Sequence, residues 1–589
     1  MNSLLSSLRI RLFDRIPSKN PIILSIGIGG RKIVMKIIKG FPSNSHDDYP
    51  LNVTTILKHA VRNFAGQEIV SRTRGGIFRY TYKDAYERIK RLANALESLG
   101  IKPGDRVGVL EWNTYRYMEL YFGIPGIGAV HLEMNVRLAP LDLTYVANHA
   151  GAELIFVDET LIPIVEAMQS EFKPAKGYVI LTDKNLREIE TKLSPIYSYE
   201  DLLKEAKPEY HWPMIDETSA YSACYTSGTT GRPKGVFYSH RDTYLLSTVA
   251  AIILELTIRD CLLQIVPLYH ALGWCNHIAV LLAGSKLVLP GRYTLGELEL
   301  IIDLMVKEKV TIAIAASAAW MPIYEYIRNI KEKPNLRGVR LYSGASEPPI
   351  AMLKGFYELT GAKVYHVSGA TENTAWSTMN KPKPWLESKL SEEERWELQR
   401  RQGLEVPGCD VKIVDGNGNE LPNDGKSAGE LLLRAPWVIG SYYNAPETAD
   451  RFTDDGYWKS GDVATIDPEG YIKIVDRIKD VIKSGGEWIS SVDMENEIMC
   501  HPAVLEAAVC GLPHPKWEER PFALVVLREE FKGKVNKEDI MNHIRNKFAR
   551  WQLPDEVKFV DEIPKTSVGK FKKSAIRERY KDEYMSKQA

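Results

Sequence analysis

A short run of small and hydroxyl-bearing residues, YTSGTTGRPKG at Tyr225–Gly235, carries the strongest chemical signal in the chain. Glycine lets backbone amides approach and surround an anion. The serine and threonine hydroxyls add hydrogen-bond donors, and Lys234 adds a positive charge. We therefore predict a loop that holds a polyphosphate. It is not a Walker A loop, because that motif needs serine or threonine directly after the lysine, where this chain has Gly235.

Six further motifs follow this loop along the chain. They are PLYHALGW, YSGASEPP, SGATEN, GYWKSGD, DRIKDVIKSGGEWIS and PKTSVGK. Together with the phosphate loop they resemble, in the same order, the adenylate-forming (AMP-binding) superfamily, and the resemblance covers the chain from Phe41 onward. The strings GGEWIS and WCNHIAVLLAGSKLVLPG make the chain most similar to the medium- and long-chain fatty acyl-CoA synthetase branch, which forms AMP.

The resemblance implies a two-step reaction. A carboxylate attacks the α-phosphate of ATP and expels pyrophosphate, and the thiol of CoA then displaces AMP from the mixed anhydride. Both steps build negative charge on oxygen atoms, so such a site must supply positioned cations and amides.

The resemblance also implies which residues bind the nucleotide. Those expected at the β- and γ-phosphates are Thr226, Ser227, Gly228, Thr229, Thr230 and Gly231, with Lys234 nearby. Thr226 and Glu372 are expected to hold Mg²⁺, a hard ion that prefers oxygen ligands. Asp462 is expected on the ribose hydroxyls, and Arg477 on ribose or phosphate. The other expected nucleotide-binding residues are Gly344, Ala345, Ser346, Gly369, Thr371, Lys483 and Trp488.

Lys570 is the expected catalytic residue, because it matches the lysine that bridges the substrate carboxylate and the α-phosphate. Its charge is most useful in the transition state of adenylation, where the negative charge develops. His270 is expected to assist catalysis, with Tyr269 beside it near the substrate carboxylate. Lys479 matches the hinge at which the small domain rotates.

Four positions bear on the acyl group. Trp274 matches an indole that gates the acyl tunnel, and Gly369 stands where acetate-activating relatives carry a tryptophan, which predicts an open acyl pocket. Glu347 and Asn373 are expected to add polar groups near that pocket, so a short hydroxy acid remains an alternative. In addition, Ser368 replaces the usual adenine-stacking aromatic residue, and Tyr365 or Tyr342 is expected to compensate.

The elements that position these residues alternate between strands and helices up to about Gly403, which predicts an α/β fold with mostly parallel sheets. Beyond it, Asn-, Gly- and Asp-rich segments predict a small antiparallel or barrel-like sheet, followed by a compact α+β region. We therefore expect a basic extension over residues 1–40, a large domain of parallel and mixed sheets wrapped by helices over 41–478, and a small mobile domain over 479–589. The apolar stretch Val310–Ile323 is expected to form a buried strand and loop, and Trp385–Arg401 a charged surface helix.

Composition excludes several other classes of protein. The 589 residues balance 76 basic against 76 acidic side chains, so nothing global favours nucleic acid as a partner. No apolar run reaches the ~18 residues that a membrane helix needs. The six cysteines are scattered without a CxxC pair, which indicates buried thiols in a reducing cytoplasm.

The first 40 residues contain one acid, Asp14, among several basic residues; we expect a loosely docked extension or an upstream start codon chosen in error.

The resulting hypothesis is a carboxylic acid:CoA ligase that activates a medium- or long-chain fatty acid, with ATP, Mg²⁺ and CoA as cofactors and a homodimer as the implied assembly. The alternatives are a ligase for a short-chain or hydroxy acid such as 4-hydroxybutyrate, an adenylating enzyme that loads a carrier protein, and a monooxygenase of luciferase type. A catalytically dead binding protein is disfavoured, because both Lys570 and Glu372 are present.

Overall fold

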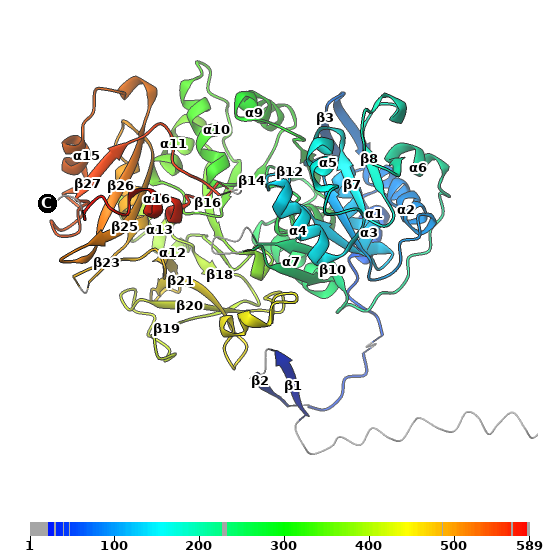
Figure 1. Ribbon diagram of the computed structural model, residues 1–589, viewed down its shortest axis with the longest axis horizontal. Helices are drawn as coiled ribbons and strands as arrows, with labels where there is room; N and C mark the ends of the chain where they lie inside the picture. Colours follow the sequence, from blue (N-terminus) through cyan, green and yellow to red (C-terminus); the bar gives the residue numbers. More distant parts are fainter. Residues whose placement is uncertain are drawn as a thin grey trace, which may run out of the picture.

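The computed structural model describes residues 22–28, 31–38, 40–45, 48–226, 232–485, 487–566 and 569–585. The body of the molecule contains two large sheets, a small antiparallel sheet and a separate α+β unit (Figure 1). A hairpin of β1 (Ile22–Ile28) and β2 (Arg31–Ile37) is drawn apart from this body.

The first large sheet has the strand order β11-β10-β6-β5-β7-β8-β9, and all neighbours are parallel except the β10–β11 pair. Its strands are β5 (Arg106–Leu110), β6 (Val130–Glu133), β7 (Ala152–Asp158), β8 (Tyr178–Leu181), β9 (Ile196–Ser198), β10 (Ala220–Tyr225) and β11 (Gly235–Ser239). The connection between β10 and β11 is the predicted phosphate loop, so the sheet fixes both of its ends.

The second large sheet has the order β18-β17-β16-β15-β14-β12-β13-β3-β4, with a parallel centre and antiparallel edges. Its strands are β3 (Glu68–Thr73), β4 (Gly76–Thr81), β12 (Cys261–Gln264), β13 (Lys286–Leu289), β14 (Ile312–Ala316), β15 (Arg340–Gly344), β16 (Lys363–Ser368), β17 (Thr378–Met379) and β18 (Leu404–Glu405). The nucleotide-binding candidates at 344–346 and 369–372 follow the carboxyl ends of β15 and β16, where parallel sheets usually place ligands.

Helices cover both sheets. They are α1 (Val53–Phe64), α2 (Tyr82–Ser98), α3 (Tyr115–Gly126), α4 (Pro140–Ala150), α5 (Ile162–Met168), α6 (Tyr199–Glu205), α7 (His240–Ile253), α8 (Asn276–Ala283), α9 (Leu298–Lys307), α10 (Ser317–Asn329), α11 (Ile350–Thr360), α12 (Pro384–Glu387) and α13 (Glu392–Arg400). Capping boxes start several of them: at α7 the Ser239 hydroxyl accepts from the Asp242 N–H, and the Asp242 carboxylate accepts from the Ser239 N–H.

Two sequence expectations need correction here. The stretch Val310–Ile323 forms strand β14 and then the first turns of helix α10, not a strand and a loop. The helical stretch Trp385–Arg401 is present as α12 and α13, but it is not wholly a solvated surface, since Arg400 is buried.

The chain after Gly403 first forms an antiparallel sheet, as predicted, of β19 (Asp410–Val414), β20 (Gly429–Arg434), β21 (Trp458–Ile466) and β22 (Ile472–Arg477). The following α+β unit contains β23 (Ile482–Ser484), β24 (Glu487–Ile489), α14 (Ser491–Met499), β25 (Val504–His514), β26 (Glu518–Leu527), α15 (Lys537–Ile544), β27 (Glu556–Phe559) and α16 (Lys573–Tyr580). This unit has apolar clusters of its own, which makes it a small separate domain. It lies beside α10 and α11 at one end of the molecule (Figure 1).

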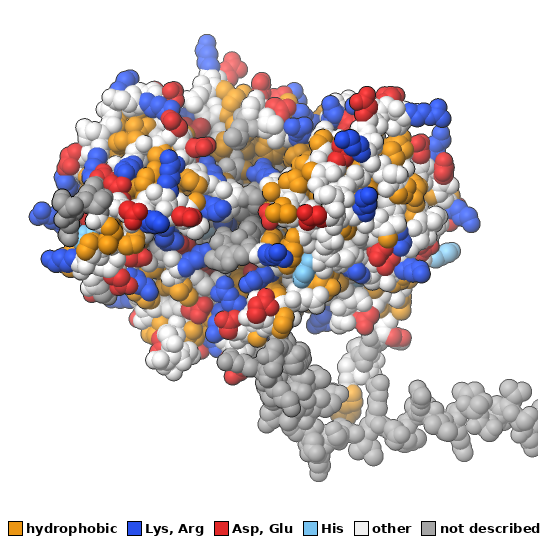
Figure 2. Space-filling view, viewed as in Figure 1, with side chains coloured by type: hydrophobic (Ala, Val, Ile, Leu, Met, Phe, Trp, Pro, Cys, Tyr) orange, Lys and Arg blue, Asp and Glu red, His pale blue; other side chains and the backbone are white. Residues whose placement is uncertain are grey.

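The surface mixes charges of both signs, and Figure 2 shows basic and acidic side chains interspersed over both lobes of this face. Within the described residues, no helix is long and apolar enough to cross a membrane. All six cysteines are free, and all but Cys500 are buried.

Candidate active site

The neck of the predicted phosphate loop is closed by hydrogen bonds between its two ends. The Thr226 N–H donates to the Lys234 carbonyl oxygen at 2.9 Å, and the Lys234 N–H donates to the Thr226 hydroxyl oxygen at 3.2 Å. The next residue, Gly235, accepts from the Tyr443 N–H at 2.9 Å. Thr226 and Lys234 are therefore held together, whereas the five residues at 227–231 lie outside the described part of the chain.

Glu372 is brought to this neck by Tyr442, a residue that the sequence analysis missed. The Tyr442 hydroxyl donates to Glu372 Oε1 at 2.7 Å, and the Lys234 ammonium lies 5.1 Å from the centre of the Tyr442 ring. The preceding residue, Thr371, is fixed because its carbonyl oxygen accepts from the Tyr238 hydroxyl at 2.8 Å. The carboxylate and the loop lysine thus share one aromatic side chain.

Asp462 and Arg477 are cross-strand partners on β21 and β22. The Arg477 guanidinium pairs with Asp462 Oδ1 at 2.7 Å, and this ion pair is largely buried on the aspartate side. Asp462 raises the pKa of Arg477, while burial raises the pKa of Asp462 against the opposing effect of Arg477. The structure therefore brings these two predicted nucleotide ligands together.

Lys570 joins the same cluster from the small domain. Burial, with the nearby charge of Arg477, lowers the pKa of Lys570 to about 8, while Asp462 and Glu372 act in the opposite direction. Burial and the charge of Lys570 lower the pKa of His270 to about 4. Lys570 is therefore close enough to the charges of Asp462, Arg477 and Glu372 to be influenced by them, and His270 is neutral at physiological pH.

The loop that carries Lys570 docks on the start of helix α10. Gly569 has φ +82°, and a Cβ atom built on it would lie 2.5 Å from the Cβ of Ala318, so only glycine fits this close approach. The neighbouring Ser317 hydroxyl lies 2.8 Å from the Ser343 hydroxyl and donates to the Ser346 carbonyl oxygen at 2.6 Å. The same helix start thus supports both the lysine loop and the 344–346 segment.

The lowered pKa of Lys570 gives a testable pH dependence. The protonated amine is the form that neutralises negative charge, and deprotonation becomes substantial as the pH rises through about 8. We expect kcat/KM for ATP in the adenylation step, which reports the free enzyme, to fall about tenfold per pH unit above that point. Lys570→Arg keeps its charge in this range, so its profile should stay flat however low its activity. A wild-type profile that is flat to pH 9.5, or a matching fall in the arginine variant, would contradict the assignment.

The segment after His270 has an unusual backbone. Ala271, Leu272, Gly273, Trp274 and Cys275 all have φ between 47° and 59°, a left-handed turn of five residues. Such conformations cost non-glycine residues roughly 1–2 kcal/mol each. The turn is fastened by hydrogen bonds from its own groups to neighbouring elements: the Leu272 N–H donates to the Glu133 carboxyl at 3.1 Å, and the Trp274 carbonyl accepts from the Trp376 indole at 2.6 Å. Strain held in this way is typical of functional segments.

Trp274 lies against the nucleotide segment. A Cβ atom on Gly344 would lie 2.7 Å from the Trp274 ring, and Ala345, next to it, has φ +67°. Tyr269 is buried, and burial raises its pKa. The Trp274 ring therefore contacts the 344–346 segment, which is predicted to bind the nucleotide. A movement of this ring would change both the left-handed turn and that segment.

Glycine is required at position 369 by a backbone contact that the sequence analysis did not foresee. A Cβ atom at this position would lie 1.9 Å from the Ala375 carbonyl oxygen, so any side chain would collide with the backbone of the following turn. The glycine is therefore explained by this backbone contact, and the open acyl pocket stays a prediction that Gly369 does not support. The proposed adenine partners are also constrained, since Tyr342 is buried and stacks on Tyr365 with ring centres 5.5 Å apart.

Glu347 and Asn373 do not face an acyl pocket, contrary to expectation. Glu347 is buried and accepts from Arg400 Nη1 at 2.5 Å and from Asn496 Nδ2 at 2.7 Å. The Asn373 side chain accepts from the Ala370 N–H at 2.8 Å and donates to the Ser377 hydroxyl at 2.7 Å, so it stabilises its own turn.

Three further predicted residues lie at or beyond the domain junction. Lys479 lies in the turn between β22 and β23. Lys483 and Trp488 face each other across the β23–β24 hairpin, and both are exposed. In this arrangement the structure does not bring the hairpin residues to the Lys570 cluster, so their expected contact with nucleotide stays a prediction.

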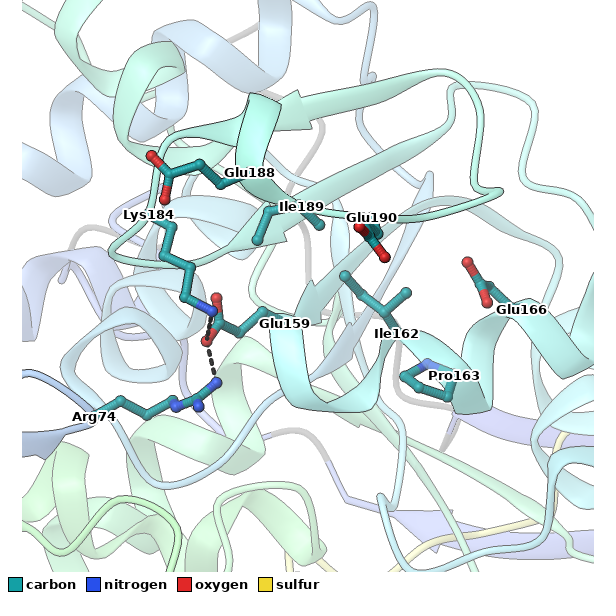
Figure 3. Close-up of a pocket in the computed structure, with 9 residues that line it drawn as sticks. All are labelled: Arg74, Glu159, Ile162, Pro163, Glu166, Lys184, Glu188, Ile189 and Glu190. Carbon is teal, nitrogen blue, oxygen red and sulfur yellow. Dashed lines mark hydrogen bonds and ion pairs between the residues drawn. The ribbon is translucent and has the colours of Figure 1, made fainter.

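A separate surface pocket lies away from this site, beside the first large sheet (Figure 3). Four glutamates line it with Arg74 and Lys184, and both cations pair with Glu159. The pocket shares no residue with the cluster around Lys570. Glu159 partly neutralises the charges of Arg74 and Lys184 there.

Comparison with known proteins identifies the fold and the family. The AMP-binding enzyme model matches residues 57–443, and the AMP-binding enzyme C-terminal domain model matches residues 493–570. The chain belongs to the AMP-binding enzyme family. It is 40% identical to a long-chain-fatty-acid–CoA ligase of Thermus thermophilus over 93% of this chain and 98% of that protein.

Other relatives agree with this family assignment. The chain is 36% identical to a medium-chain-fatty-acid–CoA ligase of Ectopseudomonas oleovorans, over 90% of this chain and 96% of that protein. It matches the fold of an anthranilate CoA ligase solved with anthranoyl-AMP, with a TM-score of 0.80 and 24% identity, over 91% of this chain and 99% of that one. The predicted fold, the predicted similarity to the medium- and long-chain branch, and the predicted class of enzyme, an AMP-forming acyl-CoA synthetase, are confirmed.

Proposed function

We propose that this AMP-binding enzyme activates a fatty acid of medium or long chain through an acyl-adenylate and transfers the acyl group to CoA. The observation that supports it most directly is the convergence of Lys570, from the small domain, on Asp462, Arg477, Glu372 and His270 of the large domain. The two fatty-acid ligases among its relatives support the choice of substrate class.

The residues at the loop neck fit a magnesium ion. Mg²⁺ in nucleotide sites is bound by one or two protein oxygens together with the substrate phosphates. Glu372 offers a carboxylate and Thr226 a hydroxyl, and within the described residues no cluster of three or more acidic, histidine or cysteine side chains offers a competing metal site. When bound with ATP, the ion would neutralise phosphate charge.

The residues of the chain then have distinct tasks in the first step. Lys234, in the loop, and Arg477 supply positive charge to the phosphates, and Asp462 accepts hydrogen bonds from the ribose. Lys570 holds the carboxylate against the α-phosphate and neutralises the charge that develops there, which accelerates the step because the interaction strengthens in the transition state. Neutral His270, beside Lys570, orients the carboxylate without adding a second cation.

For the second step, we propose that the small domain rotates about Lys479 and removes Lys570 from the site, as domain closures commonly do. The two domains are joined in this structure by a buried cluster. Asp493 on α14 accepts from Arg400 Nη2 at 2.7 Å and from the Lys473 ammonium at 2.9 Å, and Asn496 donates to Glu347. Although burial acts against it, Lys473 and Arg400 hold the pKa of Asp493 below its usual value.

This interdomain cluster predicts a variant that separates the two steps. Asn496→Ala removes the hydrogen bond to the buried Glu347 carboxylate, which disfavours the docked arrangement by about 1.5–3 kcal/mol. We expect adenylation to slow about tenfold or more, while thiolation of a supplied acyl-adenylate is unchanged or faster. Asn542→Ala, on the exposed face of α15, is the matched control. Equal loss in both steps, or no loss in either, would contradict a docking role for the cluster.

We also propose a cytoplasmic location, which the six free cysteines support. A homodimer remains a prediction from the family resemblance. The carrier-loading alternative is disfavoured by the CoA ligases among the relatives.

The test of the proposed function uses the full chain with MgATP, CoA and a panel of carboxylic acids. We expect acyl-CoA, AMP and pyrophosphate to form in equal amounts with at least one fatty acid. Formation of ADP, or a requirement for a carrier protein in place of CoA, would reject the proposal.

A further inference from the structure

A group of buried polar side chains lies beneath the strained turn and takes no part in the chemistry described above. His131 on β6, His277 on α8 and Tyr117 on α3 are each 0% exposed. Within the described part of the chain, both ring nitrogens of each histidine and the Tyr117 hydroxyl have no hydrogen-bond partner. Unpaired buried polar atoms cost free energy, so a polar atom of a ligand that reached this group would stabilise it.

The geometry connects this group to the segment that faces the acid. The Tyr121 ring stacks on His131 with ring centres 4.2 Å apart and lies 4.4 Å from the His277 ring, so it sits against both histidines. The Tyr121 hydroxyl donates to the Leu268 carbonyl, just before the residues predicted to face the carboxylate. His277 Nδ1 lies 3.5 Å from the position of a Cβ atom on Gly273, in the middle of the left-handed turn.

The group carries no charge that could receive an ionic ligand. Burial lowers the pKa of each histidine to about 3. Burial also raises the pKa of the adjacent Glu133 to about 8, although its carboxyl accepts from the Ser222 hydroxyl at 2.8 Å and from the Leu272 N–H. A neutral imidazole offers one donor and one acceptor, which suits a hydroxyl or keto group. A carboxylate or ammonium would be buried there without compensation.

We propose that this group, His131, His277 and Tyr117, receives the distal part of the acyl chain, and that the preferred acid carries an uncharged hydroxyl or keto group there. The inference rests on the proposed ligase function and narrows its substrate class. The left-handed turn at 271–275 lies against the group, because the Cβ position of Gly273 is 3.5 Å from His277 Nδ1. A plain alkyl chain would leave the polar atoms unpaired.

The experiment compares matched pairs of acids with the wild-type chain, MgATP and CoA. Each straight-chain acid from butyrate to decanoate is paired with its counterpart that bears a hydroxyl or keto group on the last or last-but-one carbon. Pyrophosphate release gives kcat/KM for each member. For the best pair we expect the polar member to be favoured about 100-fold, because sites built to hydrogen-bond a substrate reject analogues that lack the partner.

Variants of the two buried histidines test whether these residues cause the preference for the polar acid. His277→Leu and His131→Leu should each lower that ratio about tenfold or more, chiefly by improving the alkyl member, and should not lower the melting temperature, since they remove unpaired polar atoms. His240→Leu is the matched control, because His240, at the start of α7, is equally buried and unpartnered but packs against Tyr221 on β10. It should leave the ratio unchanged.

Two outcomes overturn the inference alone: wild-type enzyme that activates alkyl acids as well as their polar counterparts, or a ratio that neither histidine variant changes. If one variant fails to fold, the wild-type panel and the other variant decide. Failure of the ligase function itself looks different, because no acid of either kind then releases pyrophosphate.

Discussion

Lys570→Ala is expected to lower the rate of acyl-adenylate formation about 1,000-fold, the upper range for loss of one group that stabilises transition-state charge. The lysine is held in a cluster with Asp462, Arg477 and Glu372 and is brought there by a glycine that fits closely against Ala318. The measurement is acid-dependent exchange of pyrophosphate into ATP without CoA.

The same variant should convert a supplied acyl-adenylate and CoA into acyl-CoA at close to the wild-type rate, because the second step does not use Lys570. Lys572→Ala, an exposed lysine two residues away, is the control and should change neither rate. If the Lys570 variant loses both steps equally, the lysine supports the fold of the site and is not the bridge that we propose.

Glu372→Gln is expected to have the second largest effect, a loss of about 100-fold in kcat/KM for MgATP. The amide keeps the size of the side chain and can still contact Tyr442, but it removes the negative charge that favours a metal ion. The Mg²⁺ concentration needed for half-maximal rate should therefore rise. Adenylation rates measured over a magnesium titration provide the test.

Glu358→Gln, an exposed acid on helix α11, is the control for the loss of one negative charge. A Glu372 variant with unchanged magnesium dependence but a lowered rate would assign this carboxylate to positioning the loop through Tyr442, and the metal role would be wrong.

Much of the fold and of the site could be predicted from the sequence because the relevant signals are local. Turns rich in glycine and hydroxyl residues have few other uses, and strands that alternate with helices leave little freedom of topology. Thr226, Lys234, Glu372 and Lys570 could therefore be named as site residues from the sequence, before the structure showed where they lie in space. The family match then confirmed the class of enzyme.

The failures came from partners that are distant in sequence. Glu347 looks like a pocket residue until Arg400 and Asn496, more than 50 positions away, are seen to donate to its Oε1. Gly369 looks like an open position until Ala375 is seen to occupy the space. No local rule gives these contacts, because they depend on how separate elements pack.

The left-handed turn at Ala271–Cys275 was also beyond prediction. Its sequence holds one glycine, and four side-chain-bearing residues adopt positive φ only because Glu133, Gln264 and Trp376 hold the backbone. Tertiary hydrogen bonds override local preference there. The polar group beneath this turn was invisible for the same reason, since His131 and His277 are far apart in the chain.

The central claim is that the oxygen of the acid becomes bonded to the α-phosphate of ATP before sulfur takes the acyl group. The most direct test supplies a carboxylic acid labelled with ¹⁸O in its carboxylate, together with MgATP and CoA, and analyses the products by mass spectrometry. We expect one labelled oxygen to appear in AMP, with pyrophosphate unlabelled. Label in inorganic phosphate with ADP as the nucleotide product, or AMP without label, would contradict the account.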